Sequence, residues 1–411
     1  MPLRRNREFM LLQTGQLLSS AGSQATAIAY PLLVLGLTGS AARAGAVAFA
    51  RTLPLALFSL PAGLAADRWS RRRLMVAADA VRALALAALA VAVAAGDLAF
   101  WPITVVAFIE GTGNAVFAAA YPGALRAVVP RRQLPAAAGA QTGRQAAVYM
   151  VGPPLGGALF ELGRAIPFAV DAVSYTFSTG SLLAMRTRFQ EERVAEEASL
   201  RSRLTEGARF LWGQPFLRTC ALIFGVSNFI GPGILLTIVV VGRRQGLTGG
   251  EVGLLVAAFA AAMLVGSAAS TAVRRALPVR AVLLLELWLW VGCALFLVWP
   301  SVYVLAAGML GAGFAIPSTD SVVHGYRIAM TPDRLLGRSE SVRSTLSLLI
   351  APLGPLLAGA LLGVSARATV AAFAAAALAL AMWATLSPAL RAAPSMDELD
   401  GTMARCSSEA T

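Results

Sequence analysis

Twelve apolar stretches, each of roughly the length of a membrane-crossing helix, run through this chain of 411 residues. A helix needs about 20 residues to cross the hydrocarbon core of a bilayer. Hydrophobic residues make up 57% of the chain and charged residues only 13%, whereas soluble domains carry roughly 25% charged residues. The sequence therefore predicts an all-α polytopic membrane protein with twelve transmembrane helices. The expected spans are residues 9–37, 44–66, 74–95, 98–121, 136–160, 166–185, 218–241, 251–273, 279–299, 302–326, 340–363 and 366–387.

The arginines predict the orientation of these spans. The chain has no lysine, so all 34 basic residues are arginine. If both termini are cytoplasmic, 24 arginines fall in inner segments and five in outer loops, which matches the enrichment of basic residues on the cytoplasmic side. The first span is too long for a signal peptide and lacks a cleavage site. We expect a multi-pass protein of a bacterial inner membrane, and the alanine- and arginine-rich, lysine-free usage is typical of a high-GC genome.

Composition excludes several classes of function. Without lysine there is neither a Walker-type phosphate loop nor Schiff-base chemistry. One histidine and three scattered cysteines do not form a usual zinc site. We expect no cofactor, no metal and no enzyme. The net charge of +13 indicates cytoplasmic arginines rather than a nucleic-acid partner.

The chain divides into two halves that resemble each other. Residues 186–216 form the one long polar segment between spans, and two interpretations stay open for them: an amphipathic helix on the inner face, or a solvated linker. The sequence Gly-Pro-Pro-Leu-Gly-Gly-Ala-Leu at 152–159 matches Gly-Pro-Leu-Leu-Ala-Gly-Ala-Leu at 354–361, and Gly-Thr-Gly at 111–113 matches Gly-Ala-Gly at 311–313. We therefore expect two pseudo-symmetric six-helix bundles with a substrate site between them. The expected domains are 1–185, a linker at 186–216, 217–387, and a cytoplasmic tail at 388–411.

A short motif between the second and third spans resembles that of a known family. Residues 63–73 read Gly-Leu-Ala-Ala-Asp-Arg-Trp-Ser-Arg-Arg-Arg. This resembles the signature loop of the major facilitator superfamily, G-x-x-x-D-R-x-G-R-[RK], with Ser70 at the position of the usual glycine. The resemblance implies a latch that holds the two halves together on the cytoplasmic side. A glycine also permits close helix approach, and an aspartate can meet a positive helix N-terminus. The expected latch residues are Gly63, Asp67, Arg68, Arg71 and Arg72.

Further motifs narrow the resemblance. Gly152, Pro153, Gly156 and Gly157 match the family's antiporter motif G-P-x-x-G-G, and they predict either a helix bend or a packing seam. Asp171-Ala172-x-Ser174-Tyr175 and the segment 206–211 resemble the branch that holds the enterobactin exporter and the macrolide efflux proteins. Ala107 stands where the drug-antiporter motif has an arginine, so the resemblance does not extend to proton coupling through that residue.

Charged residues inside spans are the candidates for ion coupling, because a charge at the bilayer centre costs about 2.5–3.5 kcal/mol. Glu110, in the middle of the fourth span, is the first candidate to carry a coupling proton; the alternative is an ion pair with Arg51 or Arg144. Asp320 is the second candidate, because His324 lies on the same helical face and could share its proton. Asp79 and Arg82 are three residues apart and are expected to neutralise each other, and Glu286 is expected to extend to the inner interface.

Polar residues inside the spans predict the lining of a cavity. Gln13, Gln16, Ser20 and Gln24 follow one helical face of the first span. A polar stripe on a membrane helix lines water or bonds a neighbouring helix. The expected cavity residues are Gln16, Ser20, Gln24, Arg144, Asp171 and Asn228.

Taken together, these features predict a secondary transporter. We expect it to export a small amphiphilic molecule, such as a drug, a macrolide or a siderophore-like compound, by alternating access with proton antiport. The alternatives are an importer or a uniporter of a small metabolite on the same fold. The expected partners are this small molecule and the lipid bilayer, with no nucleic acid, and we expect the protein to act as a monomer.

Overall fold

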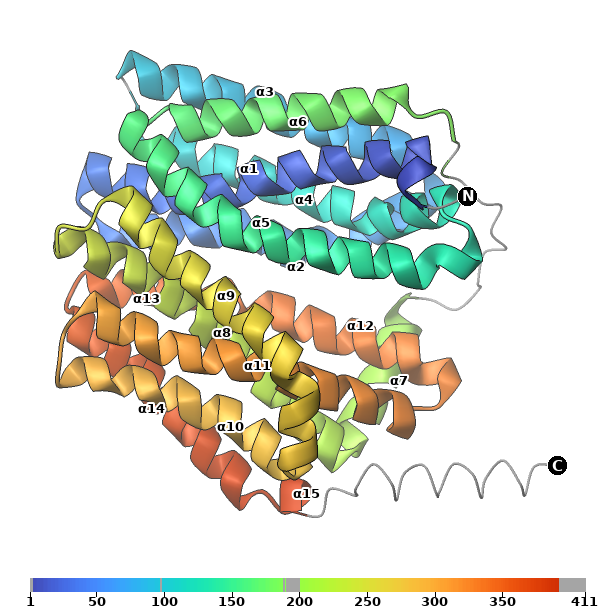
Figure 1. The fold of residues 1–411 in the computed structure, drawn as a ribbon, viewed down its shortest axis with the longest axis vertical. Helices are drawn as coiled ribbons and strands as arrows, with labels where there is room; N and C mark the ends of the chain where they lie inside the picture. The colour runs from blue at the N-terminus through green and yellow to red at the C-terminus, as the bar shows by residue number, and fades with distance from the viewer. Residues whose placement is uncertain (1–2, 97, 188, 190–199, 392–411) are drawn as a thin grey trace. The chain divides into compact units, whose positions relative to one another are not determined.

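A computed structural model describes residues 3–96, 98–187, 189 and 200–391, and these form helices joined by short turns. A chain in hydrocarbon must satisfy its backbone hydrogen bonds internally, and a helix does so within each segment. The first half holds α1 (Arg7–Thr38), α2 (Ala41–Arg68), α3 (Arg71–Ala95), α4 (Phe100–Val128), α5 (Leu134–Leu162) and α6 (Ile166–Ala184), with 3-10 turns at Leu3–Arg5 and Arg131–Gln133. These six helices lie side by side in Figure 1, and α1 packs against α5 and α6.

The second half follows the same order. It holds α7 (Leu200–Gly213), α8 (Pro215–Arg244), α9 (Gly249–Ala276), α10 (Val279–Val291), η3 (Gly292–Leu297), α11 (Val302–Met330), α12 (Asp333–Ile350), α13 (Leu353–Leu362), α14 (Ala366–Leu386) and α15 (Pro388–Arg391). The helix interpretation of the polar segment is confirmed for Leu200–Gly213, where α7 packs against α12. The rest of that segment, at 190–199, and the expected tail from 392 onward lie outside the described residues.

Local sequence signals set the helix ends. Ser40, Ser70 and Ser301 cap α2, α3 and α11, each accepting a hydrogen bond from a backbone N–H of the first turn. Gly39 and Gly96 end α1 and α3 with φ of 63° and 79°, a conformation that glycine adopts without strain. Tight caps of this kind keep the connections short.

The eleventh expected span, 340–363, matches a candidate span at Val342–Leu362, but two helices make it up. Helix α12 already begins at Asp333, and the hydrogen-bond ladder is interrupted between α12 and α13 at Ala351–Pro352. Proline has no N–H to donate, so a helix cannot keep its full ladder through it. The backbone of both residues stays in the helical region, and the two helices continue one after the other.

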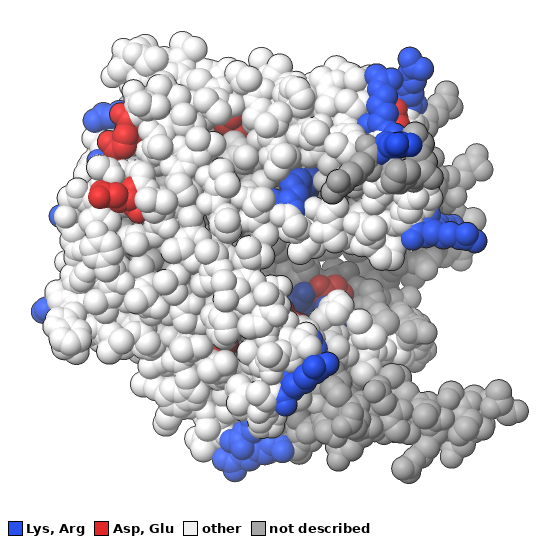
Figure 2. Space-filling model, viewed as in Figure 1, with Lys and Arg blue, Asp and Glu red and all other residues white. Residues whose placement is uncertain are grey.

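Ten of the described helical segments are long and apolar enough to cross a membrane. They cover every expected span except those of α5 and α6, which are helices at the expected positions but do not meet the same criterion of length and apolarity. Most of the described atoms on the face drawn in Figure 2 belong to uncharged residues, and the charged side chains form small separate groups. A large uncharged surface is what a protein solvated by lipid requires.

The chain separates into two compact units. The first is Met1–Val194 with Pro232–Ala260 and Pro352–Ala366, and the second is Ala195–Gly231 with Ala261–Ala351 and Arg367–Thr411. The first unit therefore contains the first six helices together with segments of α8, α9 and α13. The domain boundaries expected from the sequence stay a prediction.

Candidate functional site

An ion pair between α2 and α4 lies at the centre of the first unit. Arg51 Nη2 lies 2.6 Å and Nε 3.0 Å from Glu110 Oε1, and Arg51 also donates to the Ser23 carbonyl at 2.8 Å. Gly111 brings the helices together, because a Cβ there would overlap the Arg51 carbonyl. The Glu110 side chain is 3% exposed, and its second oxygen, Oε2, is buried without a hydrogen-bond partner. The ion-pair alternative for Glu110 is thus present, with Arg51 and not with Arg144.

A second buried pair joins Asp79 and Arg82 on α3. The two side chains form a salt bridge, and Ser178 of α6 donates its hydroxyl to Asp79 Oδ2 at 2.6 Å. Arg82 donates to the Tyr175 hydroxyl at 3.0 Å and lies over its ring. The expectation that these two charges neutralise each other is confirmed.

Ser23 and Tyr175 connect the two pairs. Their hydroxyl oxygens lie 2.7 Å apart, while Arg51 bonds the Ser23 carbonyl and Arg82 bonds the Tyr175 hydroxyl. The connected groups come from α1, α2, α3, α4 and α6. Such a network ties a charge change at one pair to the position of the other.

Asp171 is a third buried carboxyl group of the first half. Thr26 donates to Oδ2 at 3.0 Å and Ser174 donates to Oδ1 at 3.0 Å, and Gly22 leaves room for the carboxyl group against α1. Asp171 has no exposed surface. The expectation that it lines a cavity is therefore not met in this structure, because its polar atoms are satisfied between α1 and α6.

The other expected cavity residues are half-buried. Arg144 donates to Gln13 at 3.0 Å, Gln16 donates to Ser19 at 3.4 Å, and the Asn228 amide bonds the Phe224 carbonyl of its own helix. Ser20 and Gln24 are likewise half-buried on α1. Their role as cavity lining stays a prediction.

The arginines of the signature loop fasten α3 to the end of α6. Arg72 donates to the Leu182 and Leu183 carbonyls at 2.9 and 2.5 Å, and Arg71 donates to the Phe189 carbonyl at 3.0 Å. The last carbonyls of a helix lack intrahelical partners and attract cations. Ser70 in place of glycine creates no strain, because its φ is −59° and its hydroxyl caps α3.

Gly63, Asp67 and Arg68 complete that loop. Asp67 is 53% exposed and lies 3.6 Å from Arg71, and Arg68 is exposed at the end of α2. The close helix approach expected at Gly63 is absent: no described atom lies within 4 Å of the position that a Cβ would occupy there. The role of the loop as a latch stays a prediction.

The Gly-Pro motif of α5 forms a packing seam. A Cβ on Gly152 or Gly156 would overlap Gln24 or Ala25 of α1, and one on Gly157 would overlap the backbone of Gly249 in α9. Pro153 and Pro154 lie inside an α5 that runs unbroken from Leu134 to Leu162, with Pro153 against Gly253. The seam interpretation is confirmed, and the bend stays a prediction.

The repeated motif of the second half makes a matching seam. Gly359 and Pro355 of α13 lie against Gly45 of α2, where a Cβ on Gly45 would come within 2.9 Å of the Gly359 Cα. In each half the Gly-Pro motif thus packs against the second long helix of the other half. Arg243 of α8 adds a salt bridge of 2.9 Å to Glu161 of α5, and Glu161 also accepts from the Gly249 N–H at 2.6 Å. A cavity of about 460 Å³ borders this pair.

In the second unit, the contacts of Asp320 and His324 differ from those expected. Both side chains are exposed on α11, and His324 Nδ1 lies 2.9 Å from Arg327 Nη2. In this structure the imidazole contacts Arg327, and the sharing of a proton with Asp320 stays a prediction. Arg327 and Arg343 both form salt bridges with Glu340.

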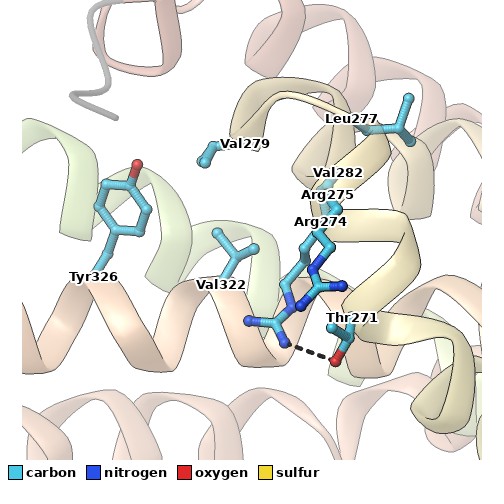
Figure 3. A pocket seen from close by; sticks show the side chains of 8 residues that line it. All are labelled: Thr271, Arg274, Arg275, Leu277, Val279, Val282, Val322 and Tyr326. Atoms are coloured by element: carbon cyan, nitrogen blue, oxygen red, sulfur yellow. Dashed lines mark hydrogen bonds between the residues drawn. The ribbon is translucent and has the colours of Figure 1, made fainter. Parts of the chain in front are cut away.

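A pocket of about 270 Å³ lies at the arginine-rich ends of α9 and α10 (Figure 3). Arg274, Arg275 and Val282 border it on one side and Tyr326 on the other, with Val322 between them. Among the residues that the structure describes, no cluster of three or more histidine, cysteine or acidic side chains could hold a metal ion.

Glu286 is a residue whose surroundings the sequence interpretation predicted wrongly. It was expected to extend to the interface, but its side chain is buried at 3% exposure in α10 and accepts a hydrogen bond from Ser227 of α8 at 2.7 Å. The expectation was wrong because Ser227 offers a bond inside the bundle. The signal available in the sequence was a lone glutamate within an apolar run, eight residues into its span.

The buried intramembrane charges, the paired Gly-Pro seams and the apolar helices define a membrane transporter of the major facilitator superfamily. Within it, the chain belongs to the transmembrane secretion effector family, whose sequence model matches residues 1–406. The family resemblance inferred from the signature loop is confirmed. This is a family of transporters and not of enzymes.

Two kinds of relative show which branch the chain is near. It is 28% identical over 376 residues to the multidrug efflux pump Tap of Mycolicibacterium fortuitum, covering 86% of this chain and 88% of that protein. It is 27% identical over 190 residues to macrolide efflux protein A of Streptococcus pyogenes, covering 46% of each chain.

Solved structures confirm the fold. A bacterial homologue of the human lysosomal transporter Spinster, in an inward-facing and unoccupied conformation, gives a TM-score of 0.70 at 15% identity, covering 95% of this chain and 96% of that one. The nucleoside transporter NupG gives a TM-score of 0.70 at 12% identity, covering 95% of this chain and 100% of that one. The protein is therefore a multi-pass transporter of the major facilitator fold that acts on small molecules in a bacterial cell membrane.

Proposed function

We propose that the protein exports a small amphiphilic molecule, of the drug or macrolide kind, in exchange for protons. The names of its relatives, a multidrug efflux pump and a macrolide efflux protein, support the direction and the substrate class. We further propose twelve spans with both termini in the cytoplasm, and a protein that acts as a monomer. A siderophore-like cargo belongs to the same substrate class.

The observation that carries the proposal is the buried Arg51–Glu110 pair. One Glu110 oxygen is held by two guanidinium nitrogens, and the other is buried without a partner. A proton and the guanidinium compete for the same carboxylate, since a protonated carboxyl group has no charge with which to hold Arg51. Protonation of Glu110 therefore releases Arg51 toward the Ser23 carbonyl, which it already contacts.

Arg51 links the protonation of Glu110 to other helices of the first unit. Its side chain is 21% exposed, and we propose that water reaches the pair from the Arg51 side. Through Ser23 and Tyr175 the change extends to Arg82 on α3. Alternating access requires a protein that adopts two states. A helix bundle that rearranges when Glu110 exchanges Arg51 for a proton meets this requirement.

Glycine seams near the start of α2 and the end of α5 supply a gate. The α5–α9 and α2–α13 seams rest on glycines that allow backbone contact, with the Glu161–Arg243 bridge beside them. We propose that these contacts form and separate in each cycle. Backbone-to-backbone packing suits that role, because it needs no side chain to change rotamer.

The proposal is tested in proteoliposomes that contain the purified chain and a fluorescent macrolide or cationic dye. An imposed pH gradient should drive substrate movement against proton movement in the wild type. Glu110→Gln should lose gradient-driven transport and keep substrate exchange without a gradient. Glu251→Gln is the matched control, because Glu251 is an exposed acid that bonds Thr248 at the start of α9.

Three results would change the assignment. Gradient-driven transport that survives in Glu110→Gln but disappears in Asp320→Asn moves the proton to the second candidate. Substrate movement without proton movement indicates a uniporter, and movement of substrate together with protons into the cell indicates an importer of a small metabolite.

A further inference from the structure

Glu286 is a buried carboxyl group in the second unit with a sparse set of partners. Its side chain is 3% exposed, and Ser227 Oγ donates to Oε1 at 2.7 Å. Thr319 and the Trp290 indole lie beside it, and the indole Nε1 is buried without a hydrogen-bond partner. In the part of the chain that the structure describes, no arginine forms a salt bridge with Glu286.

Comparison with the first half shows what is missing around Glu286. Helix α3 is the third long helix of the first half and α10 the third of the second, and each carries one acid at a similar distance from its start. In α3 the acid is Asp79, which accepts a hydrogen bond from the Ser178 hydroxyl and is neutralised by Arg82 three residues on. In α10 the serine hydroxyl is present, but the residue three positions after Glu286 is Leu289.

This difference decides which cation can balance Glu286. An ionised carboxylate inside the membrane requires a partner of opposite charge. The side chain has almost no exposed surface, so a proton is the cation that reaches it without displacing its neighbours. Asp79 has no such need, because Arg82 is fixed beside it.

The charged groups around Glu286 do not supply the missing cation. Asp320 of α11 acts on it with a like charge. Arg343 of α12 acts on Asp320, lies over the Phe224 ring and is held by Glu340 at 2.6 Å. His324 is engaged by Arg327.

We propose that Glu286 binds a second coupling proton, in the second half of the chain. The inference rests on the proton antiport proposed above and adds a site to it. The carboxylate takes up a proton from water when the site faces outward, and an O–H bond forms. It releases the proton to water when the site faces inward, and the step involves no oxidation or reduction. Protonated Glu286 can donate to Ser227 Oγ, while ionised Glu286 accepts from it.

Helix α8 carries a proline close to this site. Ser227 precedes the sequence Gly231-Pro232-Gly233, and the division between the two compact units crosses α8 at Pro232. Gly231 lies beside Trp290, where a Cβ would be 3.6 Å from the indole. Pro232 is therefore a place where α8 can bend beside Glu286.

The experiment counts protons per substrate molecule in weakly buffered proteoliposomes with a pH-sensitive dye. Glu286→Gln should move one proton fewer per substrate than the wild type, and Glu286→Asp and Glu251→Gln should move the wild-type number. An unchanged count in Glu286→Gln overturns the inference alone. A wild-type protein that moves no protons instead contradicts the proposed antiport.

Infrared difference spectra provide a measurement that does not depend on the glutamine variant folding. The wild type should show a protonated-carboxyl band that appears on acidification, and Glu286→Asp should shift that band. Leu289→Arg, which copies the Asp79–Arg82 arrangement, should abolish it while the carboxyl group is retained. A band that neither substitution changes refutes the assignment to Glu286.

Discussion

Removal of Arg51 is predicted to destabilise the protein more than removal of Glu110. Arg51→Met leaves an ionised carboxylate at 3% exposure without its cation. Breaking a buried ion pair from one side costs about 3–5 kcal/mol. Since about 1.4 kcal/mol is a factor of ten, the ratio of folded to unfolded protein should fall by roughly two to three and a half decades.

Glu110→Gln should cost less, for a reason visible in the structure. The Arg51 side chain is 21% exposed and keeps its 2.8 Å hydrogen bond to the Ser23 carbonyl, so its charge is not left without partners. A lost hydrogen bond in such a setting costs about 1–3 kcal/mol. The double variant, with neither charge, should recover most of the loss seen in Arg51→Met, because neutral replacement of a buried pair is often tolerated.

The assay is reversible unfolding in mixed micelles with increasing denaturing detergent, followed by tryptophan fluorescence. Arg243→Met is the matched control: its partner Glu161 is 43% exposed, so that pair should contribute only about 0–1 kcal/mol. Equal stability of Arg51→Met and the wild type, or a double variant no better than Arg51→Met, would refute the reasoning.

Three further predictions concern the gate, the signature loop and the topology. Gly157→Val, whose side chain would overlap the Gly249 backbone, should reduce transport by at least tenfold in the vesicle assay, whereas Gly139→Ala, with no described atom within 4 Å of the new Cβ, should not. Asp67→Asn should lower the transport rate but not the amount inserted, since a charge at a helix end contributes about 0.3–1 kcal/mol; a wild-type rate would remove the latch role. Reporter fusions should report an outer location after Gly96 and Gly246 and a cytoplasmic location after Arg73 and Arg203. The opposite result at one of these positions would show that the predicted topology is wrong there.

The two Gly-Pro seams give the internal repeat a physical meaning. The motif at 152–159 packs on α9 and its copy at 354–361 packs on α2, so each copy contacts the second long helix of the opposite half. A duplicated chain needs both copies for this arrangement, because each seam uses a glycine from each side. The seams therefore explain why small residues recur at both places.

Sequence alone determined the membrane class, the family and the position of nearly every helix of this protein. Long apolar runs can satisfy their backbone in lipid only as helices, so periodicity and length were sufficient. Composition also excluded an ordinary nucleotide site, and the spacing of Asp79 and Arg82 predicted their ion pair, because both lie on one helical turn.

Only the tertiary structure decided which partners the remaining charges have. Glu110 had two possible arginines, and the close approach of α2 and α4 at Gly111 selected Arg51. His324 bonds Arg327 rather than Asp320, and Glu286 turns inward to Ser227, a residue 59 positions away on another helix. A partner on a different helix depends on how the helices pack, and the sequence of one span does not contain that information.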